Sequence, residues 1–145
     1  MGINGTRVFL GGLVAGAIMY GVDVATNTYV LARDWAITLS ERSIDLNIST
    51  DTMAVIKFIA LDLAFGLIAV FTYAAMRPRF GPGPKAAFAA AMTLFLFMAL
   101  SMLGLQMSGF FSMGMYLKSS AGEFVSILAG TMAGAWMYKE DDLYS

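Results

Sequence analysis

The chain has 145 residues, of which 59% are hydrophobic and 13% are charged, and its net charge is −1. A soluble domain of this size could not bury so much apolar surface, because small domains have a high ratio of surface to volume, whereas lipid solvates such surface. The sequence contains no cysteine and no histidine. This excludes disulfides, zinc and iron–sulfur sites and the usual general base of enzymes. The nearly neutral charge argues against a nucleic-acid surface.

Four apolar stretches are each long enough to cross a bilayer, which takes about 20 residues in a helix. Because the backbone must satisfy its own hydrogen bonds in lipid, these stretches are expected to be helical. We place them at Val8–Leu31, Met53–Met76, Lys85–Leu105 and Ser119–Tyr138. The predicted fold class is therefore all-α: an integral membrane four-helix bundle that takes up residues 1–145 as a single domain.

The three connections differ in character. Arg33–Thr52 is polar and rich in acidic residues. Arg77–Pro84 reads RPRFGPGP, and its prolines and glycines are expected to end the second helix and to form a tight turn. Gln106–Lys118 is rich in Gly, Met and Phe and is expected to lie at the membrane interface.

The orientation follows from the basic residues that flank the spans, since positively charged flanks stay in the cytoplasm. Arg7, Arg77, Arg79, Lys85 and Lys139 lie on one side, and the acidic first connection lies on the other. Both termini are therefore predicted to be cytoplasmic. Arg77, Arg79 and Lys85 could also hold anionic lipid headgroups, although a topology signal in a tight turn explains the same residues.

Matched stripes of glycines with one acid occur in the first and fourth spans. Glycines at such spacing share one helical face and let two helix backbones approach closely. Because the two spans are antiparallel, we expect span one to pack on span four, with the glycines at one depth and the acids at another. The stripes consist of Gly12, Gly16 and Asp23 in span one and of Glu123, Gly130 and Gly134 in span four.

Three acids, Asp23, Asp62 and Glu123, fall within the predicted spans. Charges at this depth are costly unless they are paired or hydrated, so they should face the bundle interior. Two neighbouring carboxylates would not both ionise easily and could share a proton, which makes these acids a candidate proton or cation site. Alternatively, each acid is protonated, or is paired with Lys57, Lys118 or a basic residue of a partner subunit. The sequence leaves open whether Asp62 faces the other two acids.

Residues for other chemistry are missing. The chain has twelve methionines, whose thioethers could bind Cu(I), but methionine also fills irregular gaps in cores, and no Cys or His supports a metal site. No nucleotide-binding, dinucleotide-binding or serine-hydrolase motif occurs. We therefore expect no metal or other cofactor, no catalytic residue and no enzymatic activity.

The segment Tyr73–Ala87, YAAMRPRFGPGPKAA, resembles a recurring segment in an uncharacterised family of small bacterial four-span membrane proteins. The resemblance covers most of the chain. It includes a glycine-rich first span with an acid (here Gly11–Gly16 and Asp23), a following tryptophan (Trp35), and a last span that ends like Leu128–Glu140. The resemblance implies a multi-pass protein of the bacterial inner membrane and implies no activity. Asp23 stands where similar proteins are expected to have glutamate.

These features favour a non-catalytic protein that packs as an accessory or structural subunit in a larger membrane assembly. Its partners would be membrane lipids and either other membrane subunits or further copies of itself, with no nucleic acid. The alternative is a small proton- or cation-coupled transporter or channel subunit that works through Asp23, Glu123 and Asp62. Four spans make a thin pathway for one protomer, so transport would require a homo-oligomer.

Overall fold

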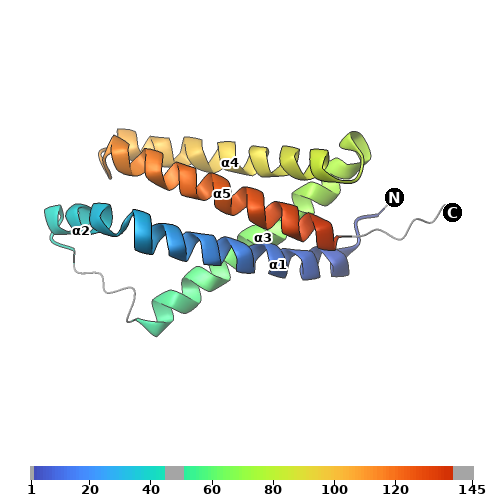
Figure 1. Cartoon of the computed structure of the whole chain (residues 1–145), viewed down its shortest axis with the longest axis horizontal. Helices are drawn as coiled ribbons and strands as arrows, with labels where there is room; N and C mark the ends of the chain where they lie inside the picture. Colours follow the sequence, from blue (N-terminus) through green and yellow to red (C-terminus); the bar gives the residue numbers. More distant parts are fainter. Residues whose placement is uncertain (1, 45–50, 139–145) are drawn as a thin grey trace.

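The computed structural model describes residues 2–44 and 51–138, and in these residues every element of regular structure is helical. This agrees with the predicted all-α fold class. The long helices run alternately up and down, with α5 lying between α4 and α1 (Figure 1). In chain order the elements are α1 (Gly5–Ala25), the π-helical turn η1 (Thr26–Val30), α2 (Ala32–Glu41), α3 (Thr52–Phe80), α4 (Pro84–Met107) and α5 (Met113–Met137).

Three helical segments are long and apolar enough to cross a membrane: Gly5–Val30, Thr52–Phe80 and Pro84–Met107. They correspond to the first three predicted spans and are consistent with a membrane protein. The fourth predicted span overlaps α5, which has the length for a crossing but is less apolar, because Lys118, Glu123 and several small residues interrupt it. α5 nevertheless packs against α1, α3 and α4.

The turn between the second and third spans is shorter than predicted. α3 continues through Pro78 to Phe80, because a proline in the last turn of a helix removes only one backbone hydrogen bond and the neighbouring turns hold the helix together. Gly81 and Gly83 then adopt φ values of +79° and +113°, a conformation that glycine accepts without a steric penalty. Pro84 starts α4 at a position where its missing N–H is not needed.

The other two connections contain more helix than predicted. The first, expected to be a polar loop, holds the ten-residue helix α2. The third shrinks to a short turn, because α5 begins at Met113 rather than at Ser119. Ser112 explains this early start: its Oγ accepts a hydrogen bond from the backbone N–H of Met115 at 3.1 Å and so caps the helix.

The core lies at one end of the bundle, which we call the tyrosine end; the opposite end is the α2 end. The buried residues of α3 begin at Gly66, and those of α4 stop at Ala91, so the half of each of these two helices toward the α2 end has no fully buried residue. Figure 1 shows the corresponding divergence, with the N-terminal half of α3 leaving the other helices at a steep angle. The core cluster consists of Ala15, Val70, Tyr73, Ala74, Ala86, Ala87, Ala90, Ala135 and Tyr138.

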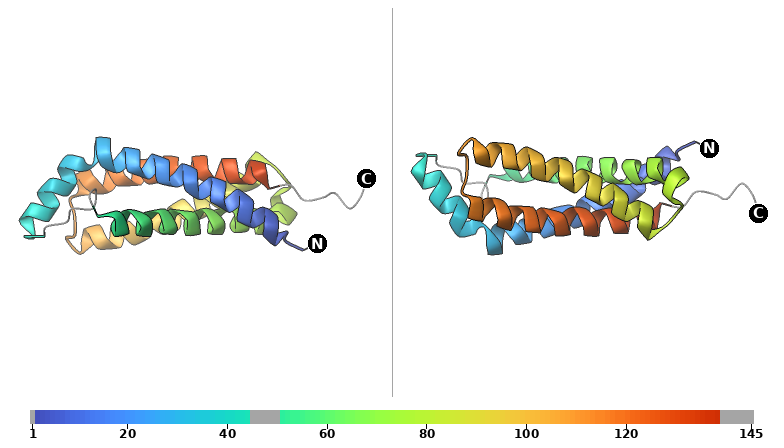
Figure 2. Two further views of the ribbon diagram at one scale, coloured as in Figure 1. Left: turned by 90° about the horizontal axis from the view of Figure 1, so that it is seen from below. Right: turned by 90° about the horizontal axis from the view of Figure 1, so that it is seen from above.

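Two tyrosines join distant parts of the chain at the tyrosine end. The rings of Tyr73 and Tyr138 meet edge to face with their centroids 5.9 Å apart. The backbone N–H of Asn4 donates to the Tyr138 hydroxyl at 3.2 Å, and that of Gly83 donates to the Tyr73 hydroxyl at 3.2 Å. The start of α1, the α3–α4 turn and the end of α5 are thereby held together, at the end of the molecule opposite α2 (Figure 2).

Candidate functional site

The glycines of α1 bring α3 unusually close. Gly12 and Gly16 face α3 rather than α5, so the predicted partner of these two glycines is wrong. A Cβ on Gly16 would lie 2.5 Å from the Cα of Leu63, and a Cβ on Gly66 would collide with the backbone of Gly12 and Gly16. Gly66 makes this contact possible, because a side chain there would collide with the main chain of α1.

α5 packs on the adjacent face of α1. A Cβ on Gly134 would lie 2.7 Å from the carbonyl oxygen of Gly11, and a Cβ on Gly130 would lie 2.8 Å from that of Ala15. Spans one and four are therefore in close contact, although through Gly11 and Ala15 rather than through the predicted glycines of span one. α1 thus presents one face of small residues to α3 and another to α5.

The close packing gathers the three predicted acids, which we call the acid cluster: Asp23 of α1, Asp62 of α3 and Glu123 of α5. The main chain of Asp62 lies directly against Gly16, because a Cβ there would be 2.6 Å from the Asp62 carbonyl oxygen. All three side chains are partly buried, and each lies within electrostatic range of the other two. Asp62 therefore lies on the part of α3 that packs against α1, near enough to Asp23 and Glu123 for their charges to interact.

Polar groups of α1 and α5 surround Asp23. The buried hydroxyl of Ser126 lies beside the Asp23 carboxylate and also reaches the Met19 carbonyl oxygen at 3.3 Å, so it can donate to only one of them at a time. The Asn27 side chain donates to the Asp23 carbonyl oxygen at 2.8 Å and accepts from the Trp35 indole N–H at 2.8 Å. Asn27 belongs to the π-helical turn, a feature that often lies near functional sites and that the sequence pattern does not reveal.

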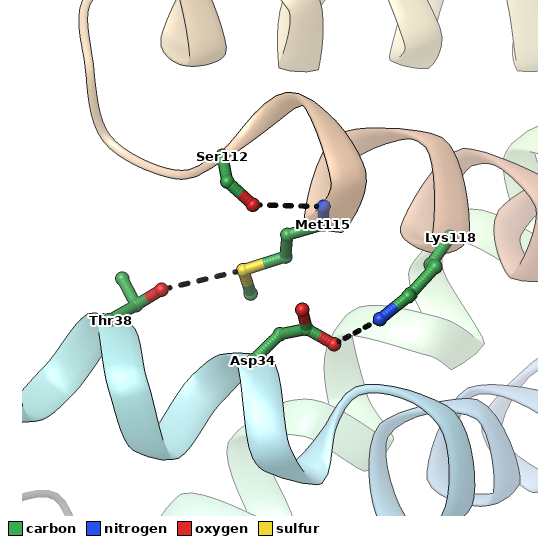
Figure 3. A network of polar contacts seen from close by, with 5 residues as sticks. All are labelled: Asp34, Thr38, Ser112, Met115 and Lys118. Atoms are coloured by element: carbon green, nitrogen blue, oxygen red, sulfur yellow. Dashed lines mark hydrogen bonds and ion pairs between the residues drawn. The ribbon is translucent and has the colours of Figure 1, made fainter.

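The acid cluster has no compensating cation in the described part of the chain. In residues 2–44 and 51–138, no basic side chain forms an ion pair with any of the three acids. Lys118, one of the two expected partners, pairs instead with Asp34 of α2, at 2.8 Å between Nζ and Oδ2 (Figure 3). Lys57, the other one, is exposed on α3. Within the same residues, no three His, Cys, Asp or Glu side chains are arranged to hold a metal ion.

A second polar group of residues joins α2 to the start of α5 (Figure 3). Besides the Asp34–Lys118 ion pair, the Thr38 hydroxyl donates to the sulfur of Met115 at 3.6 Å. Arg42 donates to the Gly109 carbonyl oxygen at 2.6 Å, and its guanidinium lies 4.9 Å from the centre of the Phe110 ring. A pocket of about 340 Å³ lies here between α2 and the α4–α5 turn. These contacts fasten α2 over the end of the bundle.

The basic turn separates into an inward and an outward part. The guanidinium of Arg77 lies over the ring of Tyr138, 5.4 Å from its centroid, and has buried nitrogen atoms, so this arginine points into the bundle. Arg79 and Lys85 are exposed at the same end. Contact with lipid headgroups stays a prediction, and its geometry favours Arg79 and Lys85 over Arg77.

No family model, curated protein or solved structure matches the chain. The resemblance to a family of small bacterial membrane proteins therefore stays a prediction, and the function must be argued from the geometry.

Proposed function

We propose that the protein is a four-span membrane protein that acts as a non-catalytic structural subunit of a larger assembly in a bacterial inner membrane. One observation carries this proposal. Three partly buried acids lie together at the point where α3 leaves the bundle, and no cation in the described part of the chain compensates them.

Four crossings rather than three are supported by the tyrosine end. The hydrogen bond from Asn4 to Tyr138 joins the N-terminal end of α1 to the C-terminal end of α5, so the two ends of the described chain lie at the same end of the bundle. An even number of crossings follows if each long helix spans the bilayer. The exposed Arg79 and Lys85 lie at this end, which favours a cytoplasmic location for it. α5 is then the fourth span, and its Glu123 lies against other helices rather than against lipid.

An assembly would solve the electrostatic problem of the acid cluster. Removing charges from water costs several kcal/mol for each ion when no partner compensates them. Mutual repulsion among three carboxylates adds to this cost. A basic side chain from another subunit would remove both the desolvation cost and the repulsion.

The test is the native mass of the untagged protein after gentle extraction from its own membrane, with all co-migrating chains identified. A complex of constant composition that contains other protein chains besides this one is the expected result. Extraction in a harsher detergent serves as the control, because it should release the single chain. A single free chain in the gentle extract, or copies of this chain alone, would overturn the proposal.

The gathering of acids from three helices also favours a second function, proton or cation coupling across the membrane. In this case Asp23→Asn and Glu123→Gln should abolish ion flux in reconstituted vesicles while the protein stays folded. Glu41→Gln is the matched control, because it removes an exposed acid outside the cluster. Unchanged flux in the two cluster variants, or no flux above empty vesicles in the wild type, would exclude this function.

A further inference from the structure

An exposed apolar stripe, which we call the α3 stripe, begins in the half of α3 that leaves the bundle and continues into the packed half: Phe58, Leu61, Phe65 and Ile68. Phe58, Leu61 and Ile68 are 47%, 50% and 51% exposed, and Phe65 is partly exposed. The spacings of three, four and three residues place the four side chains on one face of the helix. This is the pattern of the a and d positions in a two-stranded helix packing.

Opposite charges flank the α3 stripe. With Phe58 at an a position and Leu61 at a d position, Lys57 occupies g and Asp62 occupies e. In parallel helix pairs, residues at g and e form the interhelical salt bridges, and g of one helix meets the e that lies five positions further along the other. Lys57 and Asp62 are separated by five residues.

These two residues cannot pair within one chain. Five residues at about 100° each place them roughly 140° apart around the helix axis. Lys57 accordingly has no ion pair in the described part of the chain, and neither has Asp62. Each copy therefore carries an unpaired cation and an unpaired anion at the spacing that a second copy would satisfy.

We propose that two copies of this chain associate in the membrane through their α3 stripes, with Lys57 of each copy paired to Asp62 of the other. A two-fold axis along the membrane normal makes the contact self-complementary and forms both ion pairs at once. The inference deepens the proposed function, on which it rests, by naming a second copy as one member of the assembly.

The ion pairs favour association more than the apolar side chains do. Lipid covers an apolar stripe nearly as well as protein does, so the stripe supplies packing but little hydrophobic drive. Opposite charges attract far more strongly where little water screens them. A cation at Asp62 also weakens the repulsion that this acid exerts on Asp23 and Glu123.

Because the chain contains no cysteine, single cysteines can report the contact in native membranes. Leu61→Cys lies in the α3 stripe, and Ala60→Cys is its matched control, because Ala60 is exposed at nearly the same depth on another face. Under mild oxidation we expect about tenfold more disulfide-linked dimer from Leu61→Cys, a ratio equivalent to about 1.4 kcal/mol. Equal yields from the two positions, or no dimer, would overturn the inference.

The charges are tested in the Leu61→Cys background. Lys57→Met keeps the length of an exposed side chain and removes its charge, and it should reduce the dimer about tenfold. Lys57→Asp should do the same, and combining it with Asp62→Lys should restore the dimer. A yield that does not respond to Lys57→Met would show that the charges play no part, and this variant decides the question even if Asp62→Lys fails to fold.

The native mass of the same membranes separates this inference from the proposed function. A large complex of constant composition without a Leu61→Cys dimer would refute the self-contact and leave the structural role standing. A dimer of this chain with nothing else bound would support the self-contact and refute a role in a larger assembly.

Discussion

The backbone of Gly66 in α3 lies against the backbone of Gly16 in α1, and a Cβ at either position would collide with main-chain atoms of the opposite helix. This contact fixes both the distance between the two helices and the rotation of α3 about its own axis. Asp62 lies one turn from Gly66, so the same contact holds Asp62 within electrostatic range of Asp23 and Glu123. The glycine pair is therefore the structural basis of the acid cluster.

Gly66→Ala should destabilise the protein by about 1–3 kcal/mol, because the added methyl group has no space and must push two backbones apart. The free energy of unfolding can be measured by titrating the protein in mild detergent with dodecyl sulfate. Gly21→Ala is the control, since a Cβ at Gly21 meets no atom within 4 Å. Equal stability of the two variants would show that the close helix crossing is not required.

Lys118→Met should loosen α2 while changing the global stability by no more than about 1 kcal/mol. The Lys118 side chain is 49% exposed, and partly exposed ion pairs contribute little to the free energy of unfolding. The same pair nevertheless helps to hold α2 against α5, so amide hydrogens of α2 should exchange faster in the variant. Lys85→Met, a change at an exposed lysine away from α2, should leave this exchange as in the wild type. Unchanged exchange in both variants would contradict the anchoring role.

Two variants of Tyr138 should separate the contribution of its hydrogen bond to stability from the contribution of its ring. Tyr138→Phe keeps the ring, removes the hydroxyl that accepts from the Asn4 N–H, and should cost about 0.5–1.5 kcal/mol. Tyr138→Ala also removes the ring that contacts Tyr73 and Arg77 and should cost about 3–5 kcal/mol. Thermal unfolding in detergent measures both. If the two variants lose the same stability, the ring contacts contribute nothing.

The number of crossings can be tested with cysteines and a membrane-impermeant thiol reagent. In a four-span protein, Ser40→Cys and Met113→Cys are labelled on intact cells, and Gly2→Cys is labelled only after the membrane is permeabilised. A protease-cleavable tag added after the last residue should be protected in intact cells. If the three cysteines are labelled as expected but the tag is cleaved in intact cells, α5 does not cross and the chain has three spans.

The helical membrane fold could be predicted from the sequence, because runs of apolar residues with the length of a bilayer have few other structures available. Their ends could not. Pro78 and the following residues read as a turn, but the last turn of α3 tolerates a proline, and the polar residues before Asp51 concealed the amphipathic helix α2.

The acid cluster could be predicted only in part. Depth along a helix follows from counting residues, and so the acids of α1 and α5 were expected near each other. The tightest contact of a helix decides which of its faces points toward the neighbouring helices. No pattern in the sequence of α3 identified Gly66 as that contact. For the same reason Gly12 and Gly16 were predicted to contact the wrong helix. Residue spacing defines a face of α1 but does not say which helix packs on that face.

The buried residues of α3 and α4 all lie near the tyrosine end, so the two leaflets of a membrane would act on the molecule unequally. In the leaflet around the tyrosine end, acyl chains would meet a closed bundle. In the other leaflet the acyl chains would reach between α3 and α4. There, lateral pressure acts on the N-terminal arm of α3, which begins at Thr52 and has no fully buried residue before Gly66. The angle of this arm would then respond to the thickness and chain packing of that leaflet alone.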